Sequence, residues 1–203
     1  MTEQIEQSID EHQAPERRPR PKPGERRLQI LQALAEMLQR PGGERVTTAA
    51  LAAKLEVSEA ALYRHFASKA QMFEGLIDFI EQSVFGLVQQ IDMKEPDPLG
   101  QVRLVMTMVL RFAEQNPGMA RVMAGDALVQ ENERLQARMN LLFDKLESAL
   151  KQRLREAGSG NAVVQGAVLV AFVMGRMQRF VRSGWKRAPT EQLDDCLALL
   201  LSR

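Results

Sequence analysis

The sequence contains few residues able to support covalent or metal chemistry. Its 203 residues include one cysteine, Cys196, and two histidines, His12 and His65, which stand far apart in the chain. A single cysteine excludes an internal disulfide and favours a reducing, cytoplasmic compartment, and no Cys/His cluster has the spacing of a metal site. The segment GSGN at 158–161 lacks the lysine of a phosphate-binding loop. These absences argue against an enzyme, and we expect no cofactor.

A long hydrophobic run is also missing. The most apolar stretch, residues 162–175, has only fourteen residues and includes Gln165, which makes it short for a membrane span. The first twelve residues, MTEQIEQSIDEH, are acidic and polar, unlike the basic and then apolar start of a signal peptide. We therefore expect a soluble cytoplasmic protein without a membrane partner.

Aromatic residues make up only 5% of the chain, while leucine, alanine, glutamine, glutamate and arginine are abundant. These residue types favour helix throughout, so the predicted fold class is all-α. Methionines of the C-terminal part are interpreted as adaptable core filler rather than as a ligand pocket, although the sequence does not exclude a pocket. They are Met106, Met108, Met119, Met123, Met174 and Met177. No obligatory small-molecule ligand is expected.

The net charge of +1 is unevenly distributed. Residues 1–14 carry four carboxylates and no lysine or arginine, whereas residues 15–73 carry eleven lysines and arginines against six glutamates. The densest basic part, PERRPRPKPGERR, contains alternating prolines that prevent a helix, so residues 1–24 are predicted to form a flexible acidic and basic arm. Such an arm acts either as a solvated linker or as a contact to nucleic-acid phosphates.

Residues 25–85 predict a three-helix domain with a helix-turn-helix motif at about 47–66. Apolar spacing indicates a helix over 25–40, and Thr47 or Thr48 can cap the next helix. Ser58 can cap a second short helix after a tight turn, and Ser68 can start a long helix that runs to about residue 91. The side chains predicted to face inward are Val46, Leu51, Leu55, Val57, Leu62 and Phe66.

The second short helix of this motif leaves small and polar residues outside the core. Because Leu62 and Phe66 are four residues apart, they define its buried face. Small side chains allow a helix to approach the floor of a major groove, and Tyr63 and Arg64 can hydrogen-bond to phosphates or base edges. The alternative is an ordinary three-helix bundle that does not bind DNA.

The segment TTAALAAKLEVSEAALYRHFASKAQMFEGL, residues 47–76, resembles the DNA-binding domain of TetR-type regulators, with Tyr63, His65-Phe66 and Lys69 in register. Glu56 departs from the glycine that is usual in the turn, at a cost of roughly 1 kcal/mol if a left-handed backbone is needed there. The resemblance, together with the basic residues that precede the motif, predicts a set of DNA-contacting residues. They are Arg26, Arg27, Thr47, Thr48, Ser58, Ala60, Ala61, Tyr63, Arg64, His65 and Lys69.

Residues 86–203 predict a helical regulatory and dimerisation domain. Helices are expected near 99–115, 118–124, 126–157, 161–186 and 190–202, with a coiled-coil-like amphipathic helix over 126–157. The 161–186 helix has little polar face, and Ala167, Ala171 and Gly175 at four-residue spacing permit close helix approach. We expect the last two long helices to form a four-helix interface in a homodimer. The alternative is that the 161–186 helix is central within one subunit.

Four further segments extend the resemblance to the nucleoid occlusion branch of the TetR family. They are VSEAALYRHFASKAQMFEGLIDFIEQSV, QNPGMARVMAGDAL, ERLQARMNLLFDKLE and RFVRSGWKRAPT. The resemblance implies a nucleoid-associated dimer on palindromic double-stranded DNA that antagonises polymerisation of the division GTPase FtsZ. It places the partner surface on the fourth and fifth helices, where Phe79 and Asn116 fit the family pattern and Leu87, Arg111 and Gln115 depart from it. The alternative functions are a ligand-responsive transcriptional repressor and an adaptor module that does not bind DNA.

Overall fold

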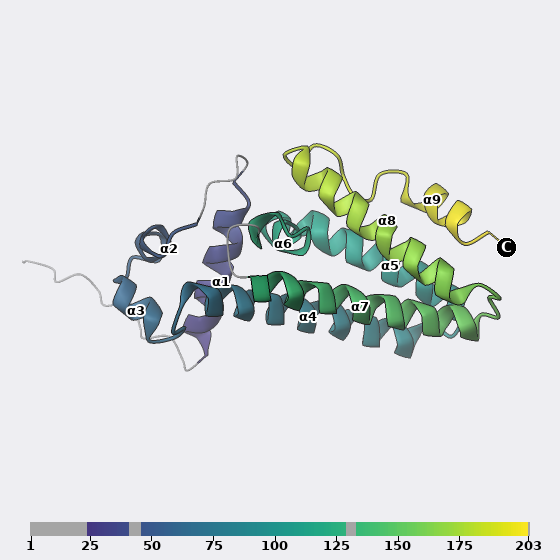
Figure 1. Ribbon diagram of the computed structural model, residues 1–203, viewed down its shortest axis with the longest axis horizontal. Coiled ribbons are helices and arrows are strands. Elements are labelled where there is room, and N and C mark those ends of the chain that lie inside the picture. Colours follow the sequence, from purple (N-terminus) through teal and green to yellow (C-terminus); the bar gives the residue numbers. More distant parts are fainter. Residues whose placement is uncertain (1–23, 41–45, 129–132, 203) are drawn as a thin grey trace, which may run out of the picture.

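The computed structural model describes residues 24–40, 46–128 and 133–202 (Figure 1). All the regular structure in these ranges is helical, which confirms the predicted all-α fold class. The helices are α1 (Glu25–Leu38), α2 (Thr48–Lys54), α3 (Glu59–Tyr63), α4 (Lys69–Lys94), α5 (Pro98–Gln115), α6 (Pro117–Met123), a 3-10 turn η1 (Asp126–Leu128), α7 (Glu133–Glu156), α8 (Ala162–Arg182) and α9 (Leu193–Leu200). The predicted arm lies outside the described residues, except for Gly24.

Local sequence signals set the starts of several helices. Ser68 caps α4 by accepting a hydrogen bond from the Gln71 backbone N–H at 3.2 Å. Asp97 caps α5 through the backbone N–H of Gly100 at 2.8 Å, and Pro98 follows at the first helical position, where its missing N–H costs nothing. These caps fix where the two long helices α4 and α5 begin.

The helices form a small N-terminal group and a larger bundle (Figure 1). α2 and α3 lie at one end of the molecule, and α1 contacts α2, α4 and α6. In the bundle, α5 packs against α4, α7 and α8, and its buried residues Val105, Met106 and Val109 have no exposed surface. α4 joins the two groups, because it contacts α1 as well as α5 and α7 of the bundle.

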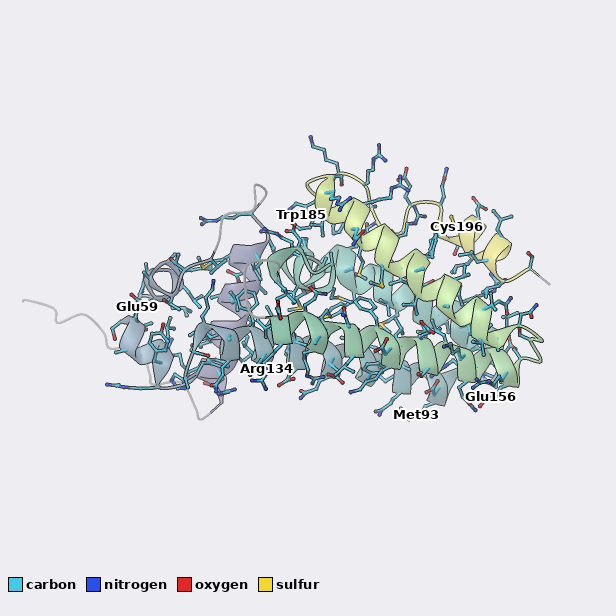
Figure 2. The ribbon with its side chains drawn as sticks, in the orientation of Figure 1. Glu59, Met93, Arg134, Glu156, Trp185 and Cys196 are labelled. Atoms are coloured by element: carbon cyan, nitrogen blue, oxygen red, sulfur yellow. The ribbon has the colours of Figure 1, made fainter. Side chains whose placement is uncertain are left out.

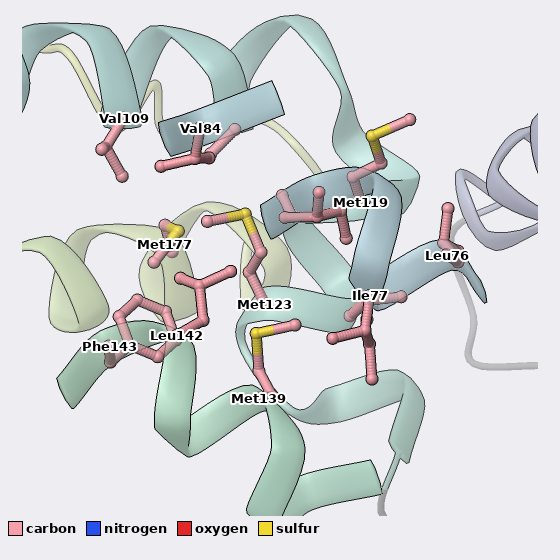
Figure 3. Packing of buried hydrophobic residues seen from close by; sticks show 14 of the residues in the cluster. Leu76, Ile77, Val84, Val109, Met119, Met123, Met139, Leu142, Phe143 and Met177 are labelled. Carbon is pink, nitrogen blue, oxygen red and sulfur yellow. The ribbon is translucent and has the colours of Figure 1, made fainter. Parts of the chain in front are cut away.

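Several methionines are buried in the core between these helices. Met106 and Met177 are completely buried, and Met119 and Met123 are at most 9% exposed. Figure 3 shows Met119, Met123, Met139 and Met177 among aliphatic residues and Phe143. Flexible thioethers suit such irregular spaces between helices. Met174 differs from this interpretation because it is 36% exposed on the surface of α8.

Three predicted boundaries in the C-terminal part need correction. The helix expected over 126–157 is not α-helical at Asp126–Leu128, which forms a 3-10 turn; α7 covers Glu133–Glu156, and residues 129–132 lie outside the described ranges. The helix expected to reach residue 186 stops at Arg182, because Gly184 and Trp185 both have positive φ. The last helix begins at Leu193 rather than at 190, since Gln192 is left-handed (φ 52°) and a right-handed helix cannot continue through it.

One face of α8 carries apolar residues that are not covered within the chain. Its other side buries Leu169, Val173 and Met177 in the bundle. The open face includes Val163, Val164 and Val168, which are 54%, 63% and 46% exposed, and Ala167, Ala171 and Gly175, all exposed. A Cβ added at Gly175 would meet nothing within 4 Å. The alternative that α8 is central within one subunit is therefore wrong for this chain, and a further surface is needed to cover the face.

Charged side chains join α4 to α7 along the outside of the bundle. Arg138 binds Asp78 at 2.9 Å and Glu81 at 2.7 Å, and Lys145 also binds Glu81. The Glu81 side chain is only 14% exposed. The hydrogen bond from Lys145, assisted by the charge of Arg138, holds the pKa of Glu81 below its ordinary value of 4.5, although burial opposes this. The hydrogen bond to Asp78 and the charge of Glu81 raise the pKa of Arg138.

Among the described residues, no helix is both long and apolar enough to cross a membrane.

Candidate nucleic-acid interface

Each of the two helices of the motif begins at a hydroxyl cap. The Thr47 hydroxyl accepts a hydrogen bond from the Ala50 N–H at 3.1 Å, and the Ser58 hydroxyl accepts one from the Ala61 N–H at 3.3 Å. Between them, Glu56 adopts a left-handed backbone with φ 55°, the conformation for which glycine is the usual residue. The predicted helix-turn-helix thus forms at the predicted place, with a strained residue in its turn.

α3 separates a buried side from an exposed side as its sequence predicts. Leu62 on α3 is 1% exposed and anchors the helix in the core; Phe66 is also 1% exposed, but it lies three residues beyond the end of α3 and not on its face as predicted. Tyr63 is 44% exposed. Ser58, Ala60, Arg64 and His65 are exposed as well, while Ala61 is half-buried. The exposed side of α3 therefore has small side chains at the start of the helix and longer polar side chains at and just beyond its end.

A side-chain hydrogen bond connects the two helices of the motif. The Thr48 hydroxyl at the start of α2 donates to Glu59 Oε2 at 2.6 Å, at the start of α3. Figure 2 shows Glu59 at the outer end of α3. Thr48 was predicted as a DNA contact, and its hydroxyl hydrogen is committed to this bond inside the motif. Sequence reasoning missed the pair because the two residues are eleven positions apart and meet only once the turn is formed.

Arg27 extends from α1 to the end of α3. Its guanidinium carbon lies 4.1 Å above the centre of the Phe66 ring, and Nη1 donates to the His65 carbonyl. This arrangement fixes the α3–α4 junction by a cation–π contact and a charge-assisted hydrogen bond. Arg27 thus holds the junction in addition to its predicted role at DNA, whereas the neighbouring Arg26 is half-buried.

α4 begins six residues after the end of α3, and its first residues are half-buried. Lys69 is the first residue of α4, directly after the Ser68 cap, and its ammonium lies 5.6 Å from the centre of the Phe73 ring. The nearby Ala67 N–H donates to Gln71 Oε1 at 2.9 Å. A helix N-terminus with a lysine is a favourable place for a phosphate. One seven-residue stretch at the α3–α4 junction thus supplies four of the predicted contacts: Tyr63, Arg64, His65 and Lys69.

The two residues predicted to bind a protein partner lie elsewhere, on α4 and at the end of α5. Phe79 is half-buried and packs against the core. Asn116 caps α5 and donates from Nδ2 to the Phe112 carbonyl at 2.8 Å. A groove of about 400 Å³ lies between the same two helices, lined by apolar residues with Lys94 and Arg111. Leu87 and Gln115, which depart from the family pattern, also line it.

Two family models match the chain and together cover most of it. Residues 30–76 match the model for bacterial regulatory proteins of the tetR family, and residues 96–203 match a tetracyclin repressor-like C-terminal domain of the SlmA type. The nucleoid occlusion factor SlmA of Vibrio cholerae is 51% identical over 183 residues, which is 86% of this chain and 93% of that protein. SlmA of Alteromonas mediterranea is 49% identical over 84% of this chain and 91% of that protein.

The chain belongs to the SlmA family of nucleoid occlusion factors. Within the wider TetR fold, a Rhodococcus transcriptional regulator superposes with a TM-score of 0.73 at 22% identity, covering 86% of this chain and 92% of that chain. FadR of Bacillus subtilis, solved in complex with stearoyl-CoA, has a TM-score of 0.69 at 16% identity, covering 86% and 97%. These two structures support the fold alone. Membership of the SlmA family implies DNA binding and dimerisation.

Proposed function

We propose that this protein is a nucleoid occlusion factor that binds palindromic DNA as a homodimer. Bound to the chromosome, it antagonises polymerisation of the division GTPase FtsZ and so blocks septum formation over the nucleoid. The observation that carries the proposal is the identity of about 50% to SlmA proteins over both domains. A match confined to the helix-turn-helix would support only a TetR-type regulator.

The DNA contacts are assigned to α3 and its two flanks. Ser58, Ala60, Ala61, Tyr63 and Arg64 face the major groove, and His65 and Lys69 face the phosphates beside it. The sugar-phosphate backbone of the DNA is contacted by Thr47 and Thr48 at the start of α2 and by Arg26 and Arg27 on α1. The exposure of α3 and the position of Lys69 at the start of α4 support this assignment. In a two-fold dimer, two such helices read half-sites about one helical turn apart.

The partner surface is assigned to the groove between α4 and α5. Leu87 and Leu104 are 36% and 45% exposed at its edges, and Met108 and Phe112 line it further. Lys94 and Arg111 add positive charge to this apolar surface. The complementary occupant is an apolar segment of FtsZ that carries carboxylates. Asn116 follows the groove residue Gln115, and Phe79 lies about two helical turns before Leu87 on α4.

The decisive experiment is sedimentation of FtsZ polymers with GTP, the protein, and the specific DNA duplex present or absent. We expect less polymer in the pellet only when protein and DNA are both present. Leu104→Glu places a carboxylate in the groove that repels the carboxylates of the proposed FtsZ segment, so it should abolish this loss of polymer. Its DNA affinity should stay within two-fold of wild type, since α3 is untouched. Leu141→Glu is the matched control, because Leu141 is 50% exposed on α7, outside the groove. No DNA-dependent loss of polymer with wild-type protein would refute the proposal.

The ligand-responsive repressor differs in how many chromosomal sites it occupies. A nucleoid occlusion factor binds many copies of one palindrome, whereas a repressor binds beside the operon that it controls. A genome-wide binding map that shows a single site next to a neighbouring operon would favour the repressor.

A further inference from the structure

The C-terminal end of α1 is held by two side chains from the second domain. The indole Nε1 of Trp185 donates to the Gln39 carbonyl at 2.9 Å, and Nη1 of Arg121 donates to the Leu38 carbonyl at 3.3 Å. The last carbonyls of a helix have no partner within the helix and must find one elsewhere. Here both partners come from more than eighty residues further along the chain. We call these two hydrogen bonds the α1 latch.

Both donors of the latch are held in place by further contacts. Arg121 is only 7% exposed, and its Nε donates to Asp126 Oδ2 at 2.6 Å. The Trp185 ring packs on Phe180, with 5.1 Å between ring centres. Gly184 and Trp185 have φ of 59° and 70°, so the chain turns sharply after α8 and directs the indole at α1. A bulky residue with positive φ is kept only where the surroundings fix it.

α6 lies directly against α1 beside the latch. A Cβ added to Gly118 would stand 1.8 Å from the Ala35 carbonyl oxygen, so no larger residue fits without separating the two helices. Figure 2 shows Trp185 near the end of α8, on the side facing α6. The latch therefore joins α1, α6 and the turn after α8 at one point.

The opposite end of α1 holds the candidate DNA interface. Arg27, near the start of α1, binds the His65 carbonyl and the face of Phe66. α1 has fourteen residues, which makes it a rod about 20 Å long at 1.5 Å per residue. A tilt of this rod at the latch would move the α3–α4 junction, because packed helices shift as rigid elements.

We propose that Trp185 and Arg121 are positioning residues for DNA binding, which hold α1 and, through Arg27, α3 in the orientation that fits the major groove. The inference rests on the DNA binding of the proposed function and adds a physical link between the second domain and α3. Because such coupling is reciprocal, DNA that selects this orientation of α3 also tightens the latch.

The test compares wild type with Trp185→Phe, which keeps an aromatic ring beside Phe180 and removes the N–H donor. The probe is a palindromic duplex that the wild-type chain selects from a random-sequence pool, and affinity is measured by anisotropy. We expect the Kd of Trp185→Phe to rise about five-fold, the effect of losing one hydrogen bond. Gln39→Ala is the matched control: the acceptor is a backbone carbonyl and the side chain is exposed, so its Kd should not change.

A second readout uses the wild type alone and does not depend on the folding of a variant. Trp185 is the single tryptophan of the chain, so its fluorescence reports on the latch. Saturating duplex should lower the acrylamide quenching constant of Trp185. Equal affinities of wild type and folded, dimeric Trp185→Phe, or a quenching constant that DNA leaves unchanged, would overturn the latch. Failure of the wild type to enrich any duplex would instead overturn the proposed function.

Discussion

Tyr63 at the end of α3 and Lys69 at the start of α4 are expected to contribute to DNA affinity in two different ways. Tyr63 is exposed and can bond to a base edge or a phosphate, while Lys69 contributes a full positive charge at the start of α4. Tyr63→Ala and Lys69→Ala should each weaken binding to the selected duplex by about ten-fold. Only Lys69→Ala should lower the slope of log Kd against log salt, by about one counterion.

Anisotropy titrations at several salt concentrations measure both quantities. Arg155→Ala, which removes an exposed arginine in the last turn of α7, is the matched control for charge. An unchanged affinity for both Tyr63→Ala and Lys69→Ala would support the adaptor alternative, in which this helix-turn-helix does not contact DNA.

The outward and inward positions of α3 were predictable from sequence because they depend on local periodicity. Leu62 is buried on α3 as the periodicity predicts, whereas Phe66 is buried from the segment beyond the end of the helix at Tyr63. The left-handed backbone of Glu56 was also foreseeable from its place in the turn. The contact of Arg27 with His65 and Phe66 was not, because it joins residues 38 and 39 positions apart in sequence and depends on how α1 packs beside the α3–α4 junction.

At the scale of helices, the ion pairs between α4 and α7 should make stability depend on pH. The pKa of Glu81 is lowered in the folded protein, so its carboxylate stabilises the fold above its ordinary value of 4.5. This contribution is lost as the pH falls through the lower, folded-state value, because protonation breaks the pairing. Glu81→Gln should therefore reduce the free energy of unfolding by about 1 kcal/mol at pH 7.

Urea unfolding at a series of pH values measures this effect. The difference between wild type and Glu81→Gln should shrink toward zero as the pH drops below 4.5. Glu74→Gln is the control, since Glu74 is an exposed residue of the same helix. A difference that does not change with pH would show that Glu81 stabilises the fold by packing and not by its charge.

Helix boundaries in the second domain show where sequence patterns stop being sufficient. The starts of α4 and α5 follow from the Ser68 and Asp97 caps, which act over two or three residues. Residues 126–128, expected in the helix over 126–157, form a 3-10 turn instead, which the Arg121–Asp126 ion pair ties to α6. Apolar periodicity alone continues across such a turn, so it predicted one uninterrupted helix.

At the scale of the whole molecule, the open apolar face of α8 is expected to form the dimer. Val164, near the N-terminal end of this face, is 63% exposed, and a second copy would cover it together with Ala167 and Ala171. Val164→Glu should convert the dimer into a monomer in sedimentation velocity, because an unpaired charge would be buried in the interface. Affinity for the palindromic duplex should fall at least ten-fold, since two linked recognition helices become one.

Leu141→Glu again serves as the control, because it adds the same charge on α7. It should sediment as a dimer and bind DNA like wild type. A Val164→Glu protein that remains dimeric would place the interface on another surface of the chain.

The uncovered face of α8 also has a consequence for how the protein responds to its own abundance. A chain with this much exposed apolar surface covers it only by forming a dimer. At equilibrium, the concentration of dimer varies with the square of the concentration of monomer. Below the dissociation constant of the dimer, halving the concentration of the chain reduces the DNA-competent form about four-fold. The fraction of chromosomal sites that are occupied then depends steeply on the expression level of the protein. This dependence comes from the valines, alanines and glycine on the open face of α8, far from the helix that reads DNA.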